Sequence, residues 1–528
     1  MQPWYADDSG LFGRHRRNAR CLKLLRQLGP WYGYFPEPAK SWHICTAAEE
    51  PFAREAFRQE GLEMQFSRGQ RYVGGFVGSE DTRAVWLAEK VDGWVYGVRM
   101  LAVVAKNYPQ TAYAGLASSL QGEWQYLCRT TPRVASALAP VEQAIREVFI
   151  PALFGGNGTV DVTDDLRTLF GHSVKAGGLG IRDPTKVADG LYHTSRSATT
   201  HLAECLADGT DLDLGRHRQG VREASAAAKT VRMAGEAAFL AAYGSGDRKT
   251  TSMLESACAA GAWLTALPRR MNGTEMCDLE FRDALRLRYN FRPLNLETAC
   301  DGCGGKFSLE HAMGCKIGGL VSRRHEAVKQ EFIHLGKLAF GHSRVIDEPK
   351  IFYGRGVRAP AGATAAALQR GAACGTAGME ARGDIAVDGF WKNSMTAVFD
   401  VRVADPNART YRGRSPASVL QQAEREKTRK YAEPCRAVRR HFTPLVYSIA
   451  GVPGRETRNA EKRLASALAA KLDRQYAEMV AWVRQRMCMA VVRQATILLR
   501  GSRVPRRLGT RPDLMDGAAF TDFDGLDE

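Results

Sequence analysis

Three cysteines and one histidine in this chain have the spacing of a zinc-binding motif. Two residues separate Cys300 from Cys303, seven more lead to His311, and three more lead to Cys315. His311 and Cys315 lie one helical turn apart, so they can close one side of a tetrahedral ion while the first two cysteines close the other. Four protein ligands leave no open position, and the spacing therefore predicts a structural zinc knuckle. We expect this short segment to need the metal to fold.

Two aspartates lie in a pattern that predicts a β-hairpin. Residues 384–390 and 396–403 alternate between apolar and polar types on either side of a short turn. With the turn centred near residues 392–393, Asp384 falls almost opposite Asp400 or its neighbour, and cross-strand neighbours lie about 5 Å apart. The two carboxylates are therefore predicted to share a magnesium or manganese ion.

A helix is predicted after this hairpin. Ser415 is a suitable N-cap residue with Pro416 following it, and the helix is expected to run to about Ala432, before Pro434. One face of it carries three candidate residues, Glu424, Lys427 and Tyr431.

With the two aspartates, these candidates have the chemistry of metal-assisted phosphodiester hydrolysis. Carboxylates hold the ion, the ion lowers the pKa of the attacking water, and a lysine stabilises the developing charge. For the glutamate and the lysine of the helix taken alone, an exposed ion pair is the simpler interpretation.

Another pair of carboxylates stands near the start of the sequence. Asp7 and Asp8 follow Tyr5 where a strand is expected to turn, and adjacent aspartates on a tight hairpin suit a divalent cation. In two-metal phosphoryl transfer, such aspartates hold the ions that activate a 3′-hydroxyl and neutralise the leaving pyrophosphate. A solvated turn is the simpler interpretation of these residues alone.

Length and composition indicate a soluble globular protein of two to four domains. Neither a membrane span nor a signal peptide is predicted. The net charge is +17 and the excess is rich in arginine, which indicates a polyanionic partner such as nucleic acid. The twelve cysteines are scattered apart from the one cluster, which fits a reducing compartment.

The elements that must position these candidates are mostly helical. Apolar residues recur at helical spacing over residues 84–154, and residues 185–295 form an Ala-rich helical connector. Residues 355–382 are rich in Gly and Ala and are predicted to be a mobile loop. Residues 513–528 are acidic and are predicted to be a disordered tail.

The order of segments near the N-terminus resembles the later part of a reverse transcriptase palm from non-LTR retrotransposons. The Asp7-Asp8 pair is followed by the segments 33–42 and 69–75. The helical segment 108–130 resembles the region after such a palm, the helical thumb, and the later segment 177–184 also fits that family. The resemblance implies that both aspartates are magnesium ligands. It places Lys40 near an incoming triphosphate and makes a primer-gripping hairpin of residues including Tyr72, Gly74 and Gly75.

That family needs a further catalytic aspartate and nucleotide- and template-binding segments before the first hairpin. Only four residues precede Tyr5. We therefore expect this chain to be the C-terminal piece of a larger element, without polymerase activity of its own.

The C-terminal half resembles the restriction-like endonuclease domain of site-specific non-LTR retrotransposons. The resemblance spans about residues 300–451 and rests on the order of the knuckle, Arg324-His325, the two aspartates and the helical motif. It implies that Asp384 and Asp400 are metal ligands, that Lys427 or Lys430 is the catalytic lysine, and that Tyr431 belongs to the same motif. The chain departs from the family pattern at three positions, where Asn, Pro and Lys are usual: Glu326, Gly383 and Arg402.

The expected fold is a multidomain α+β protein with a partial palm, helical thumb and connector, zinc knuckle and α/β restriction-like nuclease core. The expected boundaries are 1–80 for the palm, 81–184 for the thumb, 185–295 for the connector, 296–320 for the knuckle, 321–455 for the nuclease, 456–502 for C-terminal helices and 503–528 for a tail.

The expected function is binding of DNA and RNA, with nicking of target DNA for target-primed reverse transcription, and the resemblance implies a nuclear location. Two alternatives stay open. One is a catalytically inactive nucleic-acid-binding relic or domesticated element, and the other is a stand-alone zinc-knuckle nuclease unrelated to retroelements.

Overall fold

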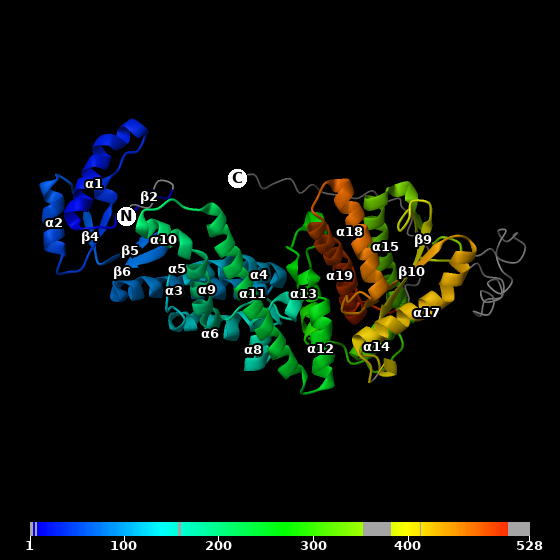
Figure 1. Cartoon of the computed structure of the whole chain (residues 1–528). Helices are drawn as coiled ribbons and strands as arrows, with labels where there is room; N and C mark the ends of the chain where they lie inside the picture. Colours follow the sequence, from blue (N-terminus) through cyan, green and yellow to red (C-terminus); the bar gives the residue numbers. More distant parts are fainter. Residues whose placement is uncertain (1–3, 6–7, 157–159, 352–381, 412, 505–528) are drawn as a thin grey trace, which may run out of the picture.

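Helices predominate in this protein and its sheets are small (Figure 1). The computed structural model describes residues 4–5, 8–156, 160–351, 382–411 and 413–504. In Figure 1 the chain runs from an N-terminal lobe, through a central helical body, to a C-terminal lobe that holds the largest sheet. The structure is thus of the mixed α+β type that the sequence predicts.

The N-terminal lobe combines two hairpins, one parallel strand pair and two helices. Its elements are β1 (Trp4–Tyr5), β2 (Asp8–Ser9), α1 (His15–Leu28), β3 (Trp42–Ile44), α2 (Glu50–Gln59), β4 (Gln65–Ser67), β5 (Gly69–Tyr72) and β6 (Gly75–Gly78). Strand β1 pairs antiparallel with β2, β3 pairs parallel with β4, and β5 pairs antiparallel with β6. Only a small core holds the lobe together, formed by Ala19, Leu22, Phe57 and Leu62.

The central body is built from helices α3 to α13. These are α3 (Glu80–Ala105), α4 (Pro109–Gly115), α5 (Gln121–Thr130), α6 (Ala139–Ala144), α7 (Ile150–Leu153), α8 (Asp164–Gly171), α9 (Pro184–Ala198), α10 (Thr200–Asp208), α11 (Leu214–Gly244), α12 (Arg248–Ala259) and α13 (Asp278–Arg288). A π-helical turn, Leu116–Leu120, joins α4 to α5, so the helix predicted up to Thr130 is confirmed. In the described ranges, no helix is long and apolar enough to cross a membrane.

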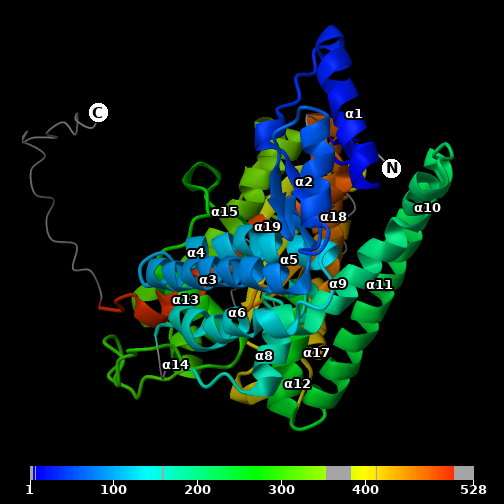
Figure 2. The same ribbon diagram turned by 90° about the vertical axis from the view of Figure 1, so that its left-hand side faces the viewer.

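The core of the body includes part of the segment predicted as a connector. Phe170 stacks on Phe154 with ring centroids 5.4 Å apart, and the Tyr289 ring lies 4.9 Å from Phe170. Residues 253–289 therefore pack into the same core as the predicted thumb. By contrast, α11 has no buried residue along its length and stands at the edge of the molecule (Figure 2).

The C-terminal lobe is a four-stranded mixed sheet with helices on both faces. Its elements are α14 (Leu309–Gly314), α15 (Leu320–Phe340), β7 (Val345–Asp347), β8 (Ile385–Asp388), β9 (Thr396–Ala404), α17 (Pro416–Ala437), β10 (His441–Ser448), α18 (Arg455–Leu472) and α19 (Tyr476–Arg500). The strand order is β10-β9-β8-β7, and only the β9–β10 pair is parallel.

Alternation along β9 decides which helices its side chains meet. Phe399 and Val401 pack into a core with α15, α18 and α19, whereas Val398 packs with Tyr431 of α17 on the opposite face. Asp400 has the parity of Val398 and so points toward α17.

The prediction that the helix after Ser415 ends before Pro434 is wrong, because α17 continues to Ala437 with Pro434 inside it. Proline has no N–H group, so a helix that contains it lacks one backbone hydrogen bond. Pro434 and Cys435 are both buried in the last turn of α17, and the free energy gained from their burial offsets that loss. The predicted N-cap is confirmed, since the Ser415 hydroxyl accepts a hydrogen bond from the Ser418 N–H at 3.2 Å.

The end of the described chain is packed and not free. Arg503, the first residue of the predicted tail, is only 1% exposed, and its guanidinium donates to the Ala312 carbonyl at 3.1 Å. The remainder of the predicted tail beyond residue 504 and the predicted mobile loop up to residue 381 lie outside the described residues.

A buried carboxyl group links α18 to the sheet. The Tyr447 hydroxyl donates to Glu461 Oε1 at 2.9 Å. Burial raises the pKa of Glu461 to about 7, although the Tyr447 hydrogen bond works in the opposite direction. Between its ordinary value of 4.5 and about 7, the folded chain holds a proton that the unfolded chain releases, so the stability from this residue falls as the pH rises through that window.

Glu461→Gln is therefore expected to leave stability nearly unchanged at pH 4.5 and to raise it above pH 7, by up to about 3 kcal/mol. The glutamine oxygen can still accept from Tyr447, while the buried charge is removed. Urea unfolding of both proteins at pH 5 and pH 8 measures this. A difference between variant and parent that does not change with pH would contradict the shifted pKa.

Candidate metal centre and nuclease site

The backbone around residues 300–306 forms a knuckle that presents two cysteines. The Gly304 N–H donates to the Cys300 carbonyl at 2.9 Å, and the Cys300 N–H donates to the Gly305 carbonyl at 2.8 Å. Gly304 has a φ of +72°, a conformation that glycine adopts without strain. The turn thereby brings the side chains of Cys300 and Cys303 to the same side.

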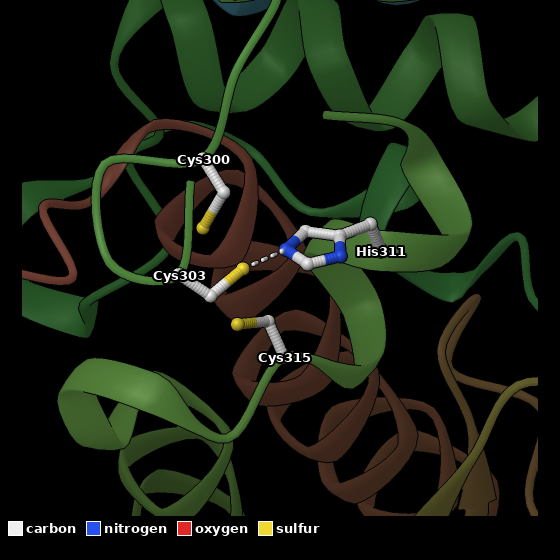
Figure 3. Close-up of side chains that lie close together, drawn as sticks. All are labelled: Cys300, Cys303, His311 and Cys315. Carbon is white, nitrogen blue, oxygen red and sulfur yellow. Dashed lines mark hydrogen bonds between the residues drawn. The ribbon is translucent and has the colours of Figure 1, made fainter. Parts of the chain in front are cut away.

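The other two candidate ligands come from α14 and the residue after it. The Ser308 hydroxyl caps this helix by accepting from the His311 N–H at 3.1 Å, and Cys315 follows the last helical residue. Figure 3 shows the three sulfur atoms and the imidazole pointing toward a common centre.

The four ligating atoms all lie within 4.8 Å of one another, and the Cys303 Sγ lies 3.4 Å from His311 Nε2. Ligand atoms around tetrahedral zinc are about 3.8 Å apart, given zinc–sulfur bonds of about 2.3 Å. The donor set and its spacing therefore fit zinc. Backbone N–H groups of Cys303 and Gly302 lower the pKa of the Cys300 thiol to about 6, which favours the thiolate that zinc binds.

The predicted hairpin of acidic residues is present as β8 and β9. Ile385 pairs with Phe399 and Asp388 pairs with Thr396, and continuing this register places Asp384 level with Asp400. The prediction that Asp384 falls almost opposite Asp400 or its neighbour is therefore confirmed for the backbone, while a metal ion shared by the two carboxylates stays a prediction.

Asp384 is held by contacts from two sides. Its Oδ2 atom lies 3.0 Å from His325 Nε2 on α15 and accepts the Val401 backbone N–H at 2.6 Å. Burial opposes its ionisation, but the His325 and Val401 hydrogen bonds outweigh burial and lower the pKa of Asp384. The same hydrogen bond raises the pKa of His325. The pair therefore favours a carboxylate beside an imidazolium.

Asp400 is more deeply buried, with 4% of its surface exposed. Its carboxylate contacts the Lys427 ammonium, and Tyr431 also hydrogen-bonds to it. Burial raises the pKa of Asp400 against the opposing effect of Lys427, and the nearby Asp384 raises it further. Asp384, Asp400, Lys427 and Tyr431, all predicted from sequence, thus come together in one place.

The two candidate catalytic lysines, Lys427 and Lys430, point to different places in the structure. Lys427 reaches Asp400, whereas Lys430 is exposed and its Nζ lies 4.7 Å from the centre of the Tyr431 ring. The geometry favours Lys427 as the lysine of this site.

Glu424 is engaged elsewhere. Its Oε1 accepts the Glu456 N–H at 2.9 Å, at the start of α18, where the N-cap residue Gly454 has no side chain to cap the helix. A Cβ atom on Gly454 would lie 2.1 Å from Glu424 Oε1, so only glycine permits this approach. Glu424 therefore makes the contacts of a helix cap, and its role in catalysis stays a prediction.

Glu424→Ala is expected to lower the free energy of unfolding by about 1–3 kcal/mol, because the backbone N–H at the start of α18 loses its buried acceptor. Chemical denaturation measures the loss. Cleavage per folded molecule should be unchanged, and a folded variant that no longer cleaves would instead make Glu424 catalytic.

Gly383, Arg402 and Glu326 each have close neighbours in the structure. A Cβ on Gly383 would lie 2.5 Å from Val398 Cγ1, so a proline ring does not fit there. Arg402 donates to Glu426 at 2.6 Å. Glu326 contacts Lys329, whose ammonium also contacts Asp347 and Glu348 at the edge of the sheet.

The N-terminal candidates are described only in part. Asp7 lies outside the described residues, and of Asp8 only the backbone, paired with Tyr5, is described. Lys40 is exposed, and its Nζ contacts Glu37 at 2.6 Å.

The predicted primer-grip hairpin is formed by β5 and β6, with Tyr72 paired to Gly75. Val73 and Gly74 make its two-residue turn with φ of 45° and 75°, which matches the right-handed twist of the strands. The Tyr126 hydroxyl on α5 donates to the Val73 carbonyl at 2.8 Å and fixes the turn. Tyr72 and Lys40 line one open cleft of about 1730 Å³.

His325 belongs to the acidic site but is not among the residues that the sequence predicts to be catalytic. The sequence singles out Arg324-His325 only through a family resemblance, because the contact with Asp384 spans 59 residues of sequence. Within the described ranges, the group of Cys300, Cys303, His311 and Cys315 is the one cluster of three or more close potential metal ligands.

Neither protein-family models nor curated protein sequences give a match to this chain.

Proposed function

We propose that this protein binds DNA and cleaves it as a metal-dependent endonuclease at the site of Asp384 and Asp400. The observation that carries the proposal is the convergence of these two carboxylates with Lys427. They come from the residue before β8, the middle of β9 and one face of α17. Two acids and a lysine at one place are the groups that phosphodiester hydrolysis needs.

The donor atoms suit a hard divalent cation. Carboxylate oxygens are preferred by magnesium and manganese, and the two aspartates would hold one such ion. When bound, the ion lowers the pKa of the attacking water and polarises the phosphate.

The remaining groups have distinct tasks. Lys427 supplies positive charge where the pentacovalent phosphate gains negative charge. His325 and the Val401 N–H fix the orientation of the Asp384 carboxylate. The zinc knuckle is structural in this proposal.

We further propose that the nuclease belongs to a retrotransposon-derived protein that acts on DNA and RNA in the nucleus. The support is the order of two hairpins, at Tyr5–Asp8 and Tyr72–Gly75, ahead of a helical body, and a cleft that Lys40 and Tyr72 share. The net charge of +17 suits a polyanionic partner.

A second candidate function is nucleic-acid binding without cleavage. It is favoured by the pairing of each carboxylate with a basic group, Asp384 with His325 and Asp400 with Lys427, and by the helix-capping contacts of Glu424. A relic that has lost its chemistry would retain such self-neutralised pairs.

Cleavage of supercoiled plasmid by the full zinc-loaded chain tests the proposal. Nicking is expected only with added magnesium or manganese, and is expected to vanish in the Asp384→Asn/Asp400→Asn double variant. Asp388→Asn is the matched control, because this carboxylate lies in the same hairpin and accepts the Thr396 hydroxyl at 2.6 Å. Nicking that persists in the double variant would overturn the site, and binding without any nicking would establish the second candidate.

A further inference from the structure

A second cavity, of about 610 Å³, lies where the helical body, the zinc knuckle and the loop after β9 meet. Helices α12 and α13 form one wall, α14 of the knuckle forms another, and residues 405–408, 411, 413 and 414 form a third. The Arg409 guanidinium and N–H both bind the Glu310 carboxylate, at 2.9 and 3.0 Å, and hold this loop against the knuckle. The space opens to solvent, and its volume is in the range of small-ligand sites.

Basic side chains line part of the cavity, and the carboxylate close to those at the rim is Asp247, which caps α12 and interacts with Lys249. Arg248 and Lys249 are exposed at its rim, and neither forms an ion pair within the described part of the chain. Arg288 lines the wall with 8% exposure, and among the described residues its guanidinium donates to the carbonyls of residues 174, 178 and 260 and to the Tyr289 hydroxyl.

The two carboxylates that line the same cavity, Glu310 and Asp405, already have partners within the protein. Glu310 is bound by Arg409, and Asp405 lies in the field of the buried Arg324 and accepts the Asn407 N–H at 2.9 Å. An anionic group at the rim would therefore be attracted and not repelled.

The walls suit a ring system with a polar edge. The partly exposed Phe291 supplies aromatic surface, the nearly buried Trp263 and Met253 lie behind the wall, and Ser252 and Asn407 add hydrogen-bonding groups. An aliphatic acid would leave these polar groups without partners, and a sugar would leave the aromatic surface without contacts.

We propose that this cavity binds a nucleotide, with its base among the apolar walls and its phosphate at Arg248 and Lys249. The negative phosphate balances the positive charge of Arg248 and Lys249 at the rim. The base offers both an aromatic face and a hydrogen-bonding edge. The ligand is either a free 5′-mononucleotide or the 5′-phosphorylated end of a strand, which share this chemistry. The proposal is independent of cleavage at Asp400.

Calorimetric titration of the full zinc-loaded chain with the four 5′-ribonucleoside monophosphates tests this, with adenosine and octanoate as comparison ligands. At least one monophosphate is expected to bind more tightly than adenosine and octanoate. Arg248→Ala/Lys249→Ala is expected to weaken binding at least about tenfold, the effect of losing a phosphate contact. Ser252→Trp, at a half-buried lining position, is expected to abolish binding by filling the cavity.

Arg216→Ala/Arg218→Ala removes the same charge from exposed positions of α11 and should leave the affinity unchanged. Competition by a 5′-phosphorylated oligonucleotide would identify a strand end as the ligand, and its failure to compete would identify the free nucleotide. Absence of monophosphate binding, tighter binding of octanoate, or equal weakening by the α11 variant would overturn the proposal. Plasmid nicking is scored separately, so the two proposals fail independently.

Discussion

Asn in place of Asp400 is expected to reduce metal-dependent nicking at least about a thousandfold, equivalent to about 4 kcal/mol of transition-state stabilisation. The carboxylate is buried beside Lys427 and level with Asp384, so the amide removes the proposed metal ligand while filling the same volume. DNA affinity should stay nearly constant, because a side chain with 4% exposure contributes little to a phosphate-binding surface. Nicking rates and binding at fixed salt, measured on the same preparation, give both quantities.

Two lysine variants on α17 sharpen this test. Lys427→Met is expected to lower the nicking rate about a hundredfold, since its charge lies beside Asp400. Lys430→Met removes an equal charge from an exposed position of the same helix and should change the rate little. A near-normal rate for Asp400→Asn, or equal losses for the two lysine variants, would remove the assignment of this site.

Replacing Cys303 by Ser is expected to release zinc and so to destabilise the knuckle. The loss in free energy of unfolding should be at least about 4 kcal/mol when the free zinc concentration is about a thousand times the dissociation constant of zinc from the knuckle. Cys303 is exposed, so the substitution removes a metal ligand without creating a core cavity. The loss should spread into α19, because Leu498 and Leu499 pack in the same core as Cys300 and Phe307. Zinc content per chain and hydrogen exchange of residues 296–320 and 490–504 are the measurements.

Cys277→Ser is the matched control for the knuckle. Cys277 is also exposed and caps α13 by accepting the Glu280 N–H at 3.5 Å, a role that serine performs equally well. This variant should retain one zinc ion and normal exchange. Full zinc content and unchanged protection in Cys303→Ser would show that the cluster is not a metal site.

Features that depend on neighbouring residues could be predicted from sequence. The knuckle ligands are set by short spacings, the Asp384–Asp400 hairpin by alternation with period two, and the start of α17 by a single N-cap residue, Ser415. Each of these is a local relation between backbone geometry and side-chain direction, so the chain encodes it without reference to the rest of the fold.

Contacts between distant segments were decided only by the tertiary structure. Packing of α15 on the sheet brings His325 to Asp384, the rotation of α17 selects Lys427 over Lys430, and the bare N-terminus of α18 attracts Glu424. Arg503 is buried because the end of α19 closes the knuckle core. The periodicity of a helix or strand determines which of its faces a residue occupies. Which other element packs on that face depends on the burial of many side chains summed over the whole fold, and local sequence does not specify it.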